Sequence, residues 1–315
     1  MKSLCAAILM TATISWAHLP AGAVFPAVQF PDNKLPVVDG NLIEWDVIPQ
    51  GYWMTHEQLT ETVIGVGTAW DATDLAVRVI VGWNPTANRF YALEDRFDDA
   101  ILVHTHWEPM EFIVDADHSA GIFGVWPDVE DQEQKDRLHG AHAQDYGFNQ
   151  GGNGLNAWHK AQWHTQQPYG AFASSQTAPE GGEGFFRAEY MVTPWDDLDW
   201  NGAGTSTIHQ LTEGEIAGFH FTIIDDDDVD AAGYEGYWTL SGATDSYFQE
   251  GQSIFTQIDH TITIKVFRNK HCWDELRVFS LNNIQLPIIV NIFSFIEITI
   301  TIMIFSKIDF VFKLE

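Results

Sequence analysis

The stretch VVDGNLIEWDVIP, residues 37 to 49, determines how the rest of the chain is interpreted. Asp39-Gly40 forms a tight turn, in which Gly40 supplies the positive φ that such turns often need. Trp45 follows with the largest apolar surface of any side chain, so we expect it to fix the entering chain onto a hydrophobic core. By itself this stretch predicts a turn followed by a buried Trp.

Four later stretches share a pattern of strand-like alternation and acidic ends. They are TAWDATDLAVRVIVGW at 68–83, MEFIVDADHSAG at 110–121, FRAEYMVTPWDDL at 186–198 and GFHFTIIDDDDVDAAGYEGYWTLSG at 218–242. Apolar residues recur at every second position, as in Leu75, Val77, Val79 and Val81. Short alternating runs bounded by Gly, Asn, Asp and Pro are typical of strands, and they predict an all-β antiparallel β-sandwich.

In this order the five stretches resemble carbohydrate-binding module family 9, within the wider DOMON-like group of secreted β-sandwiches. The family pattern is a DG…EW turn, a WD strand, a strand ending in D.D, an E…PW block and an acidic block before a Trp. The matching residues are Asp39, Gly40, Glu44, Trp45, Trp70, Asp71, Leu75, Asp115, Asp117, Glu189, Pro194, Trp195, Leu198, Asp226, Asp228 and Trp238. The resemblance implies a non-catalytic domain over residues 30–259 that binds a poly- or oligosaccharide.

The first 23 residues have the features of a secretory signal peptide. Lys2 provides the positive start, an apolar stretch follows, and Ala21-Gly22-Ala23 is an A-x-A cleavage site. We therefore expect the protein to be secreted, into the extracellular space or the periplasm. The formal charge of −29 argues against nucleic-acid binding, which needs clustered Lys and Arg. The same charge suits either an acidic surface tuned for solubility or the binding of cations.

Residues 121–184 are rich in Gly, Gln, His and aromatic residues and show little alternation. We interpret them as an ordered, elaborated loop over one end or face of the sandwich, with a short helix at 128–138. A pyranose stacks its C–H faces on flat aromatic rings. The carbohydrate-binding candidates are the loop's rings: Trp126, Tyr146, Trp158, Trp163 and Tyr169. The alternative is that these rings pack the loop onto the sandwich.

Two acidic turns are candidate calcium sites, because Ca²⁺ takes six to eight oxygen ligands. The first turn has D-x-D-x-S-x-G spacing, and the second is a dense acidic run whose carboxylates repel one another without a cation. The candidate ligands are Asp115, Asp117, Asp225, Asp226 and Asp228. The alternative at each turn is a solvated loop whose Asp side chains cap backbone N–H groups.

Composition changes near residue 260, since all 25 glycines lie at or before Gly251 and the tail is rich in Ile and Phe. Three interpretations of residues 260–315 remain open. The tail is read-through or frameshifted sequence, a membrane anchor at 286–305, or divergent closing strands. Only the second would give the protein a membrane partner.

No nucleophile elbow, P-loop or H-E-x-x-H motif is present, so the sequence predicts no enzyme. Two other functions stay open beside carbohydrate binding. Some DOMON-like relatives hold haem b between Met and His or Lys, and the candidate axial ligands here are Met54, Met110 and Met191 with His56, His104 or His220. The other alternative is a structural or adhesive surface protein.

Overall fold

A computed structural model describes residues 24–106, 108, 110–119, 129–149, 151–228, 233–240, 256–259, 280–281 and 284–285. The chain divides into two compact units, Met1–Phe267 and Arg268–Glu315. In the second unit the described residues form one antiparallel pair, β17 (Ser280–Leu281) with β18 (Ile284–Gln285). The first unit contains both large sheets and every candidate site described below.

An eight-stranded sheet forms one layer of the first unit. Its main order is β1 (Val24–Phe25), β16 (Thr256–Asp259), β14 (Ile216–Asp225), β7 (Met110–Asp115), β8 (Gln144–Phe148) and β9 (Leu155–Ala157). Strand β15 (Gly236–Thr239) pairs with β14, and β4 (Thr60–Glu61) pairs with β15. All of these pairs are antiparallel except β1 with β16.

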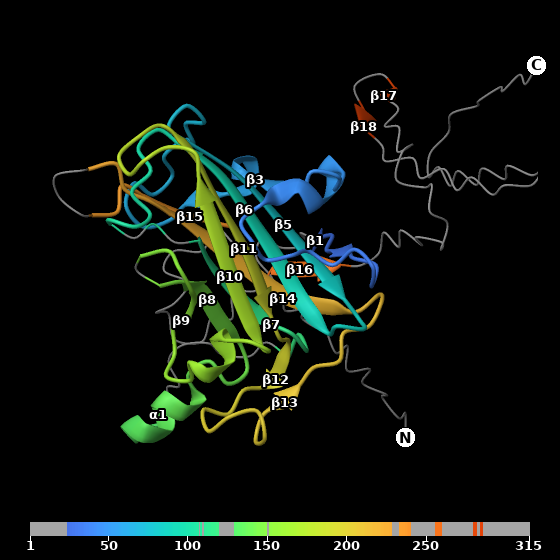
Figure 1. Cartoon of the computed structure of the whole chain (residues 1–315). Coiled ribbons are helices and arrows are strands. Elements are labelled where there is room, and N and C mark those ends of the chain that lie inside the picture. The colour runs from blue at the N-terminus through green and yellow to red at the C-terminus, as the bar shows by residue number, and fades with distance from the viewer. Residues whose placement is uncertain are drawn as a thin grey trace, which may run out of the picture. The chain divides into compact units, whose positions relative to one another are not determined.

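A six-stranded sheet forms the second layer. Its order is β10 (Gly170–Gln176), β11 (Gly184–Val192), β6 (Arg89–Asp98), β5 (Leu75–Asn84) and β2 (Val28–Gln29), and β3 (Met54–Thr55) also pairs with β5. In Figure 1 β10, β11, β6 and β5 run side by side, with β14 and β7 in the other layer. A short separate ladder joins β12 (Trp195–Asp197) to β13 (Thr207–Ile208).

The main hydrophobic core draws side chains from both sheets. The inward positions of β5 are Leu75, Val77, Val79 and Val81, and β14 adds Phe219, Phe221 and Ile223. These are the residues whose alternation predicted strands, so the predicted all-β sandwich is confirmed. Burial of so many large apolar side chains is the main source of the fold's stability.

A second core covers the outer face of the six-stranded sheet. The segment with the 3₁₀ turns η1 (Leu42–Glu44) and η2 (Gln50–Tyr52) lays Trp45, which is fully buried, over that face. Glu189 of β11 accepts hydrogen bonds from Trp45 Nε1 at 2.7 Å, from Gly40 N at 2.7 Å and from Asp39 N at 3.0 Å. Gly40 has φ +79°, and a Cβ there would lie 2.9 Å from the Ser174 backbone. The predicted turn and buried Trp are therefore observed.

The stretch 121–184 is not one elaborated loop. Its described residues contain β8, β9 and β10, the helix α1 (Gln132–Leu138) and the 3₁₀ turn η4 (Trp163–Thr165). The interpretation as a loop was wrong because β8 and β9 are short and β10 consists mostly of small and polar residues, which weakens the alternation signal. The helix begins later than predicted, after Asp131, whose side chain caps Gln134 N.

Several sequence predictions fall outside the described residues. They are the signal peptide at 1–23, Trp126, and the apolar stretch 286–305 of the tail. Among the residues that the structure does describe, no helix has both the length and the apolar character needed to span a bilayer. The remaining strand, β3, is followed by the 3₁₀ turn η3 (His56–Gln58).

Candidate functional site

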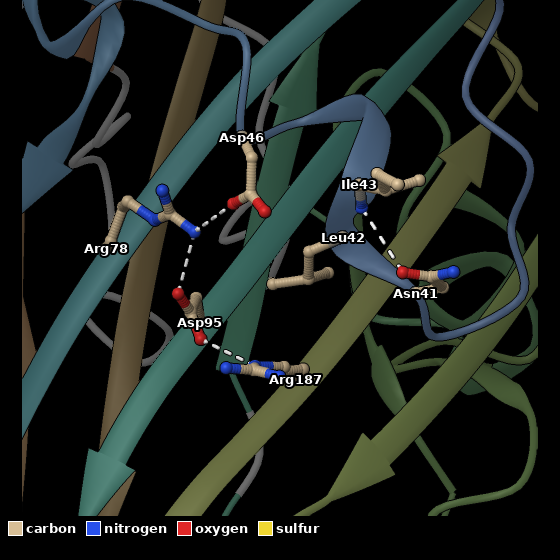
Figure 2. Close-up of a pocket in the computed structure, with 7 residues that line it drawn as sticks. All are labelled: Asn41, Leu42, Ile43, Asp46, Arg78, Asp95 and Arg187. Carbon is tan, nitrogen blue, oxygen red and sulfur yellow. Dashed lines mark hydrogen bonds and ion pairs between the residues drawn. The ribbon is translucent and has the colours of Figure 1, made fainter.

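The outer face of the six-stranded sheet carries an open hollow of about 250 Å³. Figure 2 shows the side chains that line it, which are Asn41, Leu42, Ile43, Asp46, Arg78, Asp95 and Arg187. Three of these come from neighbouring strands of the sheet and four from the segment around η1. None of them was among the sequence-predicted site residues.

The predicted carbohydrate-binding rings do not form one exposed platform. Tyr146 lies in the main core with 1% exposure and stacks on Phe112, so its ring faces protein on β8. Trp163 and Tyr169 are half-buried and pack with the fully buried Trp195 in a separate aromatic cluster. Trp163 Nε1 also donates to Asp199 O at 3.1 Å. These contacts match the alternative in which the rings anchor the chain.

Trp158 lies apart from that cluster. It is half-buried and packs against Ile113 and Ala143, on the eight-stranded sheet. Its packing partners therefore differ from those of Trp163. Of the four predicted rings that the structure describes, Trp158, Trp163 and Tyr169 retain exposed area, whereas Tyr146 does not.

Two buried imidazoles support the segment that carries these rings. His159 Nε2 and His164 Nε2 are 2.8 Å apart with nearly coplanar rings, and His164 Nδ1 lies 3.3 Å from the Tyr146 hydroxyl. Burial lowers the pKa of His164 to about 3, and burial with His164 as neighbour lowers the pKa of His159 well below its usual value. Both rings are therefore neutral at physiological pH, with one nitrogen donating and the other accepting.

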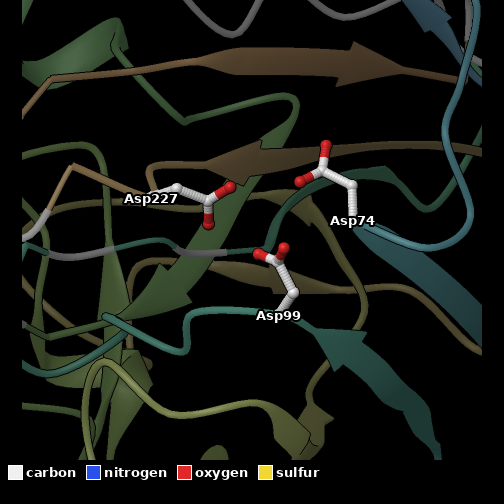
Figure 3. A group of neighbouring side chains, drawn as sticks. All are labelled: Asp74, Asp99 and Asp227. Carbon is white, nitrogen blue, oxygen red and sulfur yellow. The ribbon is translucent and has the colours of Figure 1, made fainter.

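The acidic groups that could hold a cation gather where β5 begins and β6 and β14 end. In one group, oxygens of Asp98, Asp225 and Asp227 lie within 4.8 Å of one another. In the other, oxygens of Asp74, Asp99 and Asp227 also lie within 4.8 Å of one another. Figure 3 shows these three side chains as neighbours. Asp227 belongs to both groups, so the five carboxylates form a continuous acidic cluster.

Sheet pairing brings this cluster together. Asp98 ends β6 and pairs with Leu75 at the start of β5, and Asp99 N donates to Asp74 O at 3.1 Å. Asp225 ends β14 in the other sheet. The cluster therefore joins the ends of strands from both layers of the sandwich.

Only one of the five sequence-predicted metal ligands, Asp225, lies in this cluster. Asp226 accepts from Gly233 N at 2.8 Å and lies 3.2 Å from His106 Nδ1. Asp115 and Asp117 both accept from Ser119 N, at 3.2 and 3.1 Å, which is the capping arrangement that the sequence offered as the alternative. Asp228 is exposed. Within the described residues these four belong to no group of three carboxylates close enough to share an ion.

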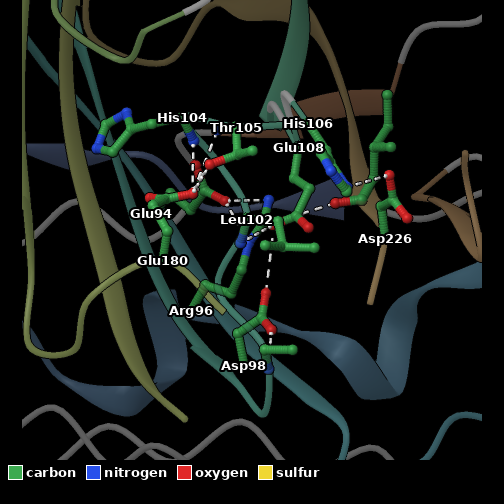
Figure 4. Close-up of polar contacts among 12 residues, drawn as sticks. Glu94, Arg96, Asp98, Leu102, His104, Thr105, His106, Glu108, Glu180 and Asp226 are labelled. Carbon is green, nitrogen blue, oxygen red and sulfur yellow. Dashed lines mark hydrogen bonds and ion pairs between the residues drawn. The ribbon is translucent and has the colours of Figure 1, made fainter. Parts of the chain in front are cut away.

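Beside the acidic cluster, one buried cation, Arg96, faces several buried carboxylates (Figure 4). Its guanidinium donates to Glu94 Oε1 at 2.7 and 3.0 Å and to Ile224 O at 3.0 Å. Glu108 Oε2 and Asp98 Oδ2 are farther from Arg96 Nη1, at 3.7 and 3.9 Å. One guanidinium therefore serves more carboxylates than it can neutralise.

The surplus of buried negative charge shifts the carboxyl groups toward their neutral forms. Burial raises the pKa of Glu108 to about 9, and burial with repulsion from Asp98 raises the pKa of Asp225 to about 7. Burial with repulsion from Asp225 raises the pKa of Asp227 to about 8. A divalent cation between these oxygens would reverse the shifts, because it favours the ionised forms.

One oxygen of Asp98, Oδ2, has the long ion pair with Arg96 Nη1 at 3.9 Å as its contact, whereas Oδ1 accepts from Ala100 N at 2.9 Å. The residue is 1% exposed, and its Oδ2 makes no hydrogen bond within the described structure. Buried carboxylate oxygens are nearly always hydrogen-bonded or bound to a metal. All of the atoms concerned are carboxylate oxygens, the ligand type that calcium prefers. The cluster therefore fits a calcium ion.

Of the six residues proposed for haem ligation, three are buried and three are half-buried. Met54 and Met110 lie in the main core with 1% and 0% exposure, among side chains from both sheets. His220 is buried on β14, where burial lowers its pKa to about 3, and His56 stacks on Trp70. His104 and Met191 are half-buried. Nothing in this arrangement favours the haem alternative.

No protein-family model matches the chain, and no curated protein matches it. Among solved structures, it is similar to a carbohydrate binding module family 9 protein from Caldicellulosiruptor kristjanssonii, solved in complex with cellotriose and with glucose. Each match has 15% identity and a TM-score of 0.45, and covers 74% of this chain and 92% or 93% of that chain. The family is the one that the ordered sequence blocks indicated. The bound sugars are properties of that protein.

Proposed function

We propose that the chain is an exported, non-catalytic carbohydrate-binding domain whose β-sandwich is stabilised by calcium. Its ligand is a poly- or oligosaccharide. The carbohydrate-binding proposal depends on one observation: the sequence blocks that resemble family 9 contact one another in the folded chain. The acidic cluster at the strand ends supports the calcium part.

The blocks of the sequence resemblance contact one another through their most specific residues. The opening DG…EW block meets the E…PW block through the hydrogen bond from Trp45 to Glu189. The WD block meets the last block through Trp70 and Trp238, whose ring centroids are 4.3 Å apart in an edge-to-face contact. Residues matched in separate blocks of the sequence are therefore in contact in the folded chain.

Those pairs are buried or half-buried, so they maintain the architecture and leave ligand contact to other residues. Trp158, Trp163 and Tyr169 remain the candidates for stacking on a sugar ring, because each is only half-buried. Tyr146 is no longer a candidate for sugar binding, because its side chain is buried in the main core.

The calcium proposal rests on the acidic cluster and on Asp98 Oδ2. Five carboxylates from strand ends of both sheets would be tied together by a single ion or by two ions sharing Asp227. Calcium bound there would stabilise the sandwich by mass action, since the unfolded chain has no such cluster. Export would place the protein where calcium is abundant.

A glycan array followed by calorimetry with the best soluble oligosaccharide tests the carbohydrate proposal. We would compare the parent with Trp158→Ala and Trp163→Ala, and use Tyr234→Ala as the matched control, since Tyr234 is an exposed ring outside residues 121–184. Loss of a stacked ring costs on the order of 1 kcal/mol or more, so binding should weaken about tenfold in at least one Trp variant. The control should bind as the parent does.

Three outcomes would go against the proposal. Absence of binding to every glycan would leave the structural or adhesive alternative. Binding that persists in both Trp variants would move the sugar site elsewhere on the domain. Release of a cleaved product during long incubation would make the protein an enzyme. Melting curves must match the parent's, because a Trp that packs the fold would lower the melting temperature on removal.

A further inference from the structure

The hollow on the outer face of the six-stranded sheet is built on a row of three side chains directly opposite one another. Arg78 of β5 pairs with Asp95 of β6, and Asp95 pairs with Arg187 of β11. Asp95 accepts a hydrogen bond from each arginine, at 2.7 Å from Arg78 Nη2 and 3.2 Å from Arg187 Nε. The central carboxylate thus fixes both guanidinium groups along the floor of the hollow (Figure 2).

Aromatic rings hold the two guanidinium groups from the side. Arg78 lies over the Trp53 ring at 4.7 Å, and Arg187 lies over the Phe185 ring at 5.3 Å. Cation–π contacts of this kind restrict the long side chains before any ligand arrives. Binding a ligand would therefore cost little further side-chain entropy, because the fold already orders these hydrogen-bond donors.

The hollow is electrically balanced. Arg78 and Arg187 contribute two positive charges, and Asp95 and Asp46 contribute two negative ones, with Asp46 Oδ1 3.6 Å from Arg78 Nη2. The two guanidinium groups would repel a cation. The chain as a whole, with a formal charge of −29, would repel an anion. The lining therefore favours a neutral ligand.

The polar atoms still available in the hollow include both donors and acceptors. In the described structure Arg187 hydrogen-bonds through Nε alone, which leaves Nη1 and Nη2 for a ligand. Asn41 uses its Oδ1 for Ile43 N and keeps its Nδ2 group, while the Asp46 carboxylate is largely exposed. Hydroxyl groups both donate and accept, so a polyhydroxylated molecule can satisfy all of these atoms at once.

One wall of the hollow is aliphatic, formed by Leu42 and by Ile43, which is 67% exposed. The volume of about 250 Å³ lies below the roughly 300–1,000 Å³ of pockets that bury drug-sized ligands. The space therefore suits a single sugar ring whose apolar face rests on Ile43 and whose hydroxyls reach the polar side.

We propose that this hollow is a second carbohydrate subsite, which takes one neutral pyranose unit. The inference rests on the proposed carbohydrate-binding function and adds a site separate from the predicted rings. Trp158 packs on the eight-stranded sheet, whereas the hollow lies on the six-stranded sheet. A polysaccharide-binding domain with two such sites would hold two chain segments or two ends.

Calorimetry and amide NMR with the full chain in calcium buffer test the subsite, with glucose, cellotriose and glucuronate as probes. The variants are Asp46→Ala and Arg187→Ala. The matched control is Arg137→Ala, which removes an arginine that lies over a different ring, Trp200, away from the hollow. Because each variant deletes a hydrogen-bonding group, we expect neutral-sugar affinity at the hollow to fall about tenfold, and the amide shifts near Ile43 to disappear. The control should keep both signals.

The outcomes separate this inference from the proposed function. If the parent binds sugar, and Asp46→Ala and Arg187→Ala bind it as the parent does, the hollow is no subsite while the carbohydrate function stands. If glucuronate shifts the amides near Ile43 and glucose does not, the neutral class is wrong. If no probe or glycan binds the parent, both proposals fail together. Because the Asp46 side chain is mostly exposed, we expect Asp46→Ala to fold. That variant alone can therefore decide the test if Arg187→Ala unfolds.

Discussion

Trp45 and Glu189 are 144 residues apart in the chain and are joined by a hydrogen bond of 2.7 Å between the indole Nε1 and a carboxylate oxygen. The other oxygen of Glu189 accepts the backbone N–H groups of Asp39 and Gly40. One carboxylate on β11 therefore fixes the whole turn that leads into the covering segment. Burial raises the pKa of Glu189, whereas the hydrogen bonds from Trp45, Asp39 and Gly40 favour the ionised carboxylate. These hydrogen bonds therefore offset part of the free-energy cost of burying its charge.

Removing this carboxylate should destabilise the domain strongly. Glu189→Ala leaves the Trp45 indole and two backbone N–H groups without their acceptor, and each unsatisfied buried donor costs about 1–3 kcal/mol. We expect the free energy of unfolding in urea to fall by at least about 3 kcal/mol. Glu183→Ala, an exposed carboxylate just before the same strand, should change it by no more than about 0.5 kcal/mol.

The Glu189→Gln variant refines the test. Its amide oxygen can still accept one set of donors, so the loss should lie between those of the Ala variant and the control. If Glu189→Ala proved as stable as the parent, the turn would be held by packing of Trp45 alone.

Local alternation in the sequence was enough to predict β5, β7, β11 and β14, because each has a continuous apolar face toward the core. Strand β6 was missed for a physical reason. Its inward positions include Glu94, Arg96 and Asp98, which are buried in the structure. In a sequence, charged residues at these positions indicate a face exposed to solvent. The pairing of Trp45 with Glu189 was equally unpredictable, since nothing local marks a contact between distant residues.

The acidic cluster was only partly predictable. Asp225 was found because it opens a dense acidic run, whereas Asp74 and Asp99 stand at the two ends of the β5–β6 hairpin. They become neighbours only when Leu75 pairs with Asp98. Recognising the hairpin around the turn at 85–88 would have placed them together. The carboxylates at Asp115 and Asp117 have the more calcium-like spacing, yet their oxygens are used for capping Ser119 N.

Calcium should raise the melting temperature through Asp227. A ligand present at a hundred times its dissociation constant stabilises by about 2.7 kcal/mol, which for a domain of this size is on the order of 5 °C or more. Differential scanning calorimetry with millimolar calcium and with chelator measures the difference. Asp227→Asn should remove most of it, because Asp227 is shared by both groups of carboxylates.

The control for that experiment is Asp117→Asn, which alters the acidic turn outside the cluster. It should retain the parental response to calcium. An unchanged response in Asp227→Asn together with a lost response in Asp117→Asn would place the ion at the 115–119 turn instead. Identical melting of the parent with calcium and with chelator would remove the calcium proposal.

Acid should destabilise the calcium-loaded domain below pH 6.5. The folded-state pKa values of His164 and His220 are lowered to about 3 and that of His159 is lowered well below its usual value, whereas the unfolded values lie near 6.5. The unfolded chain therefore binds more protons below pH 6.5. The stability that these neutral rings contribute is full above that pH and is lost as the pH falls toward 3. Each ring adds a slope of up to about 1.4 kcal/mol per pH unit.

Urea unfolding between pH 7.5 and 5.5 measures this slope. His164→Asn should reduce it by up to about 1.4 kcal/mol per pH unit, whatever its effect on absolute stability. In chelator the decline should be shallower, because the raised pKa values of Asp225 and Asp227, members of the acidic cluster, act with the opposite sign and add stability as the pH falls. Equal slopes for the parent and His164→Asn would show that His164 titrates normally in the folded state.

The boundary of the domain should lie after β16. This strand, Thr256–Asp259, pairs with β14 on one side and with β1 on the other, so its removal exposes an edge of the eight-stranded sheet. A chain ending at Phe267 keeps β16 and should melt within about a degree of the full chain, with better solubility once the Ile- and Phe-rich tail is gone. A chain ending at Gly251 loses β16 and should melt several degrees lower or fail to fold, because β14 then lacks the partner of residues 216–219.

Equal melting of the two truncated chains would mean that β16 does not close the sheet. Unfolding of the chain that ends at Phe267 would assign closing strands to the tail.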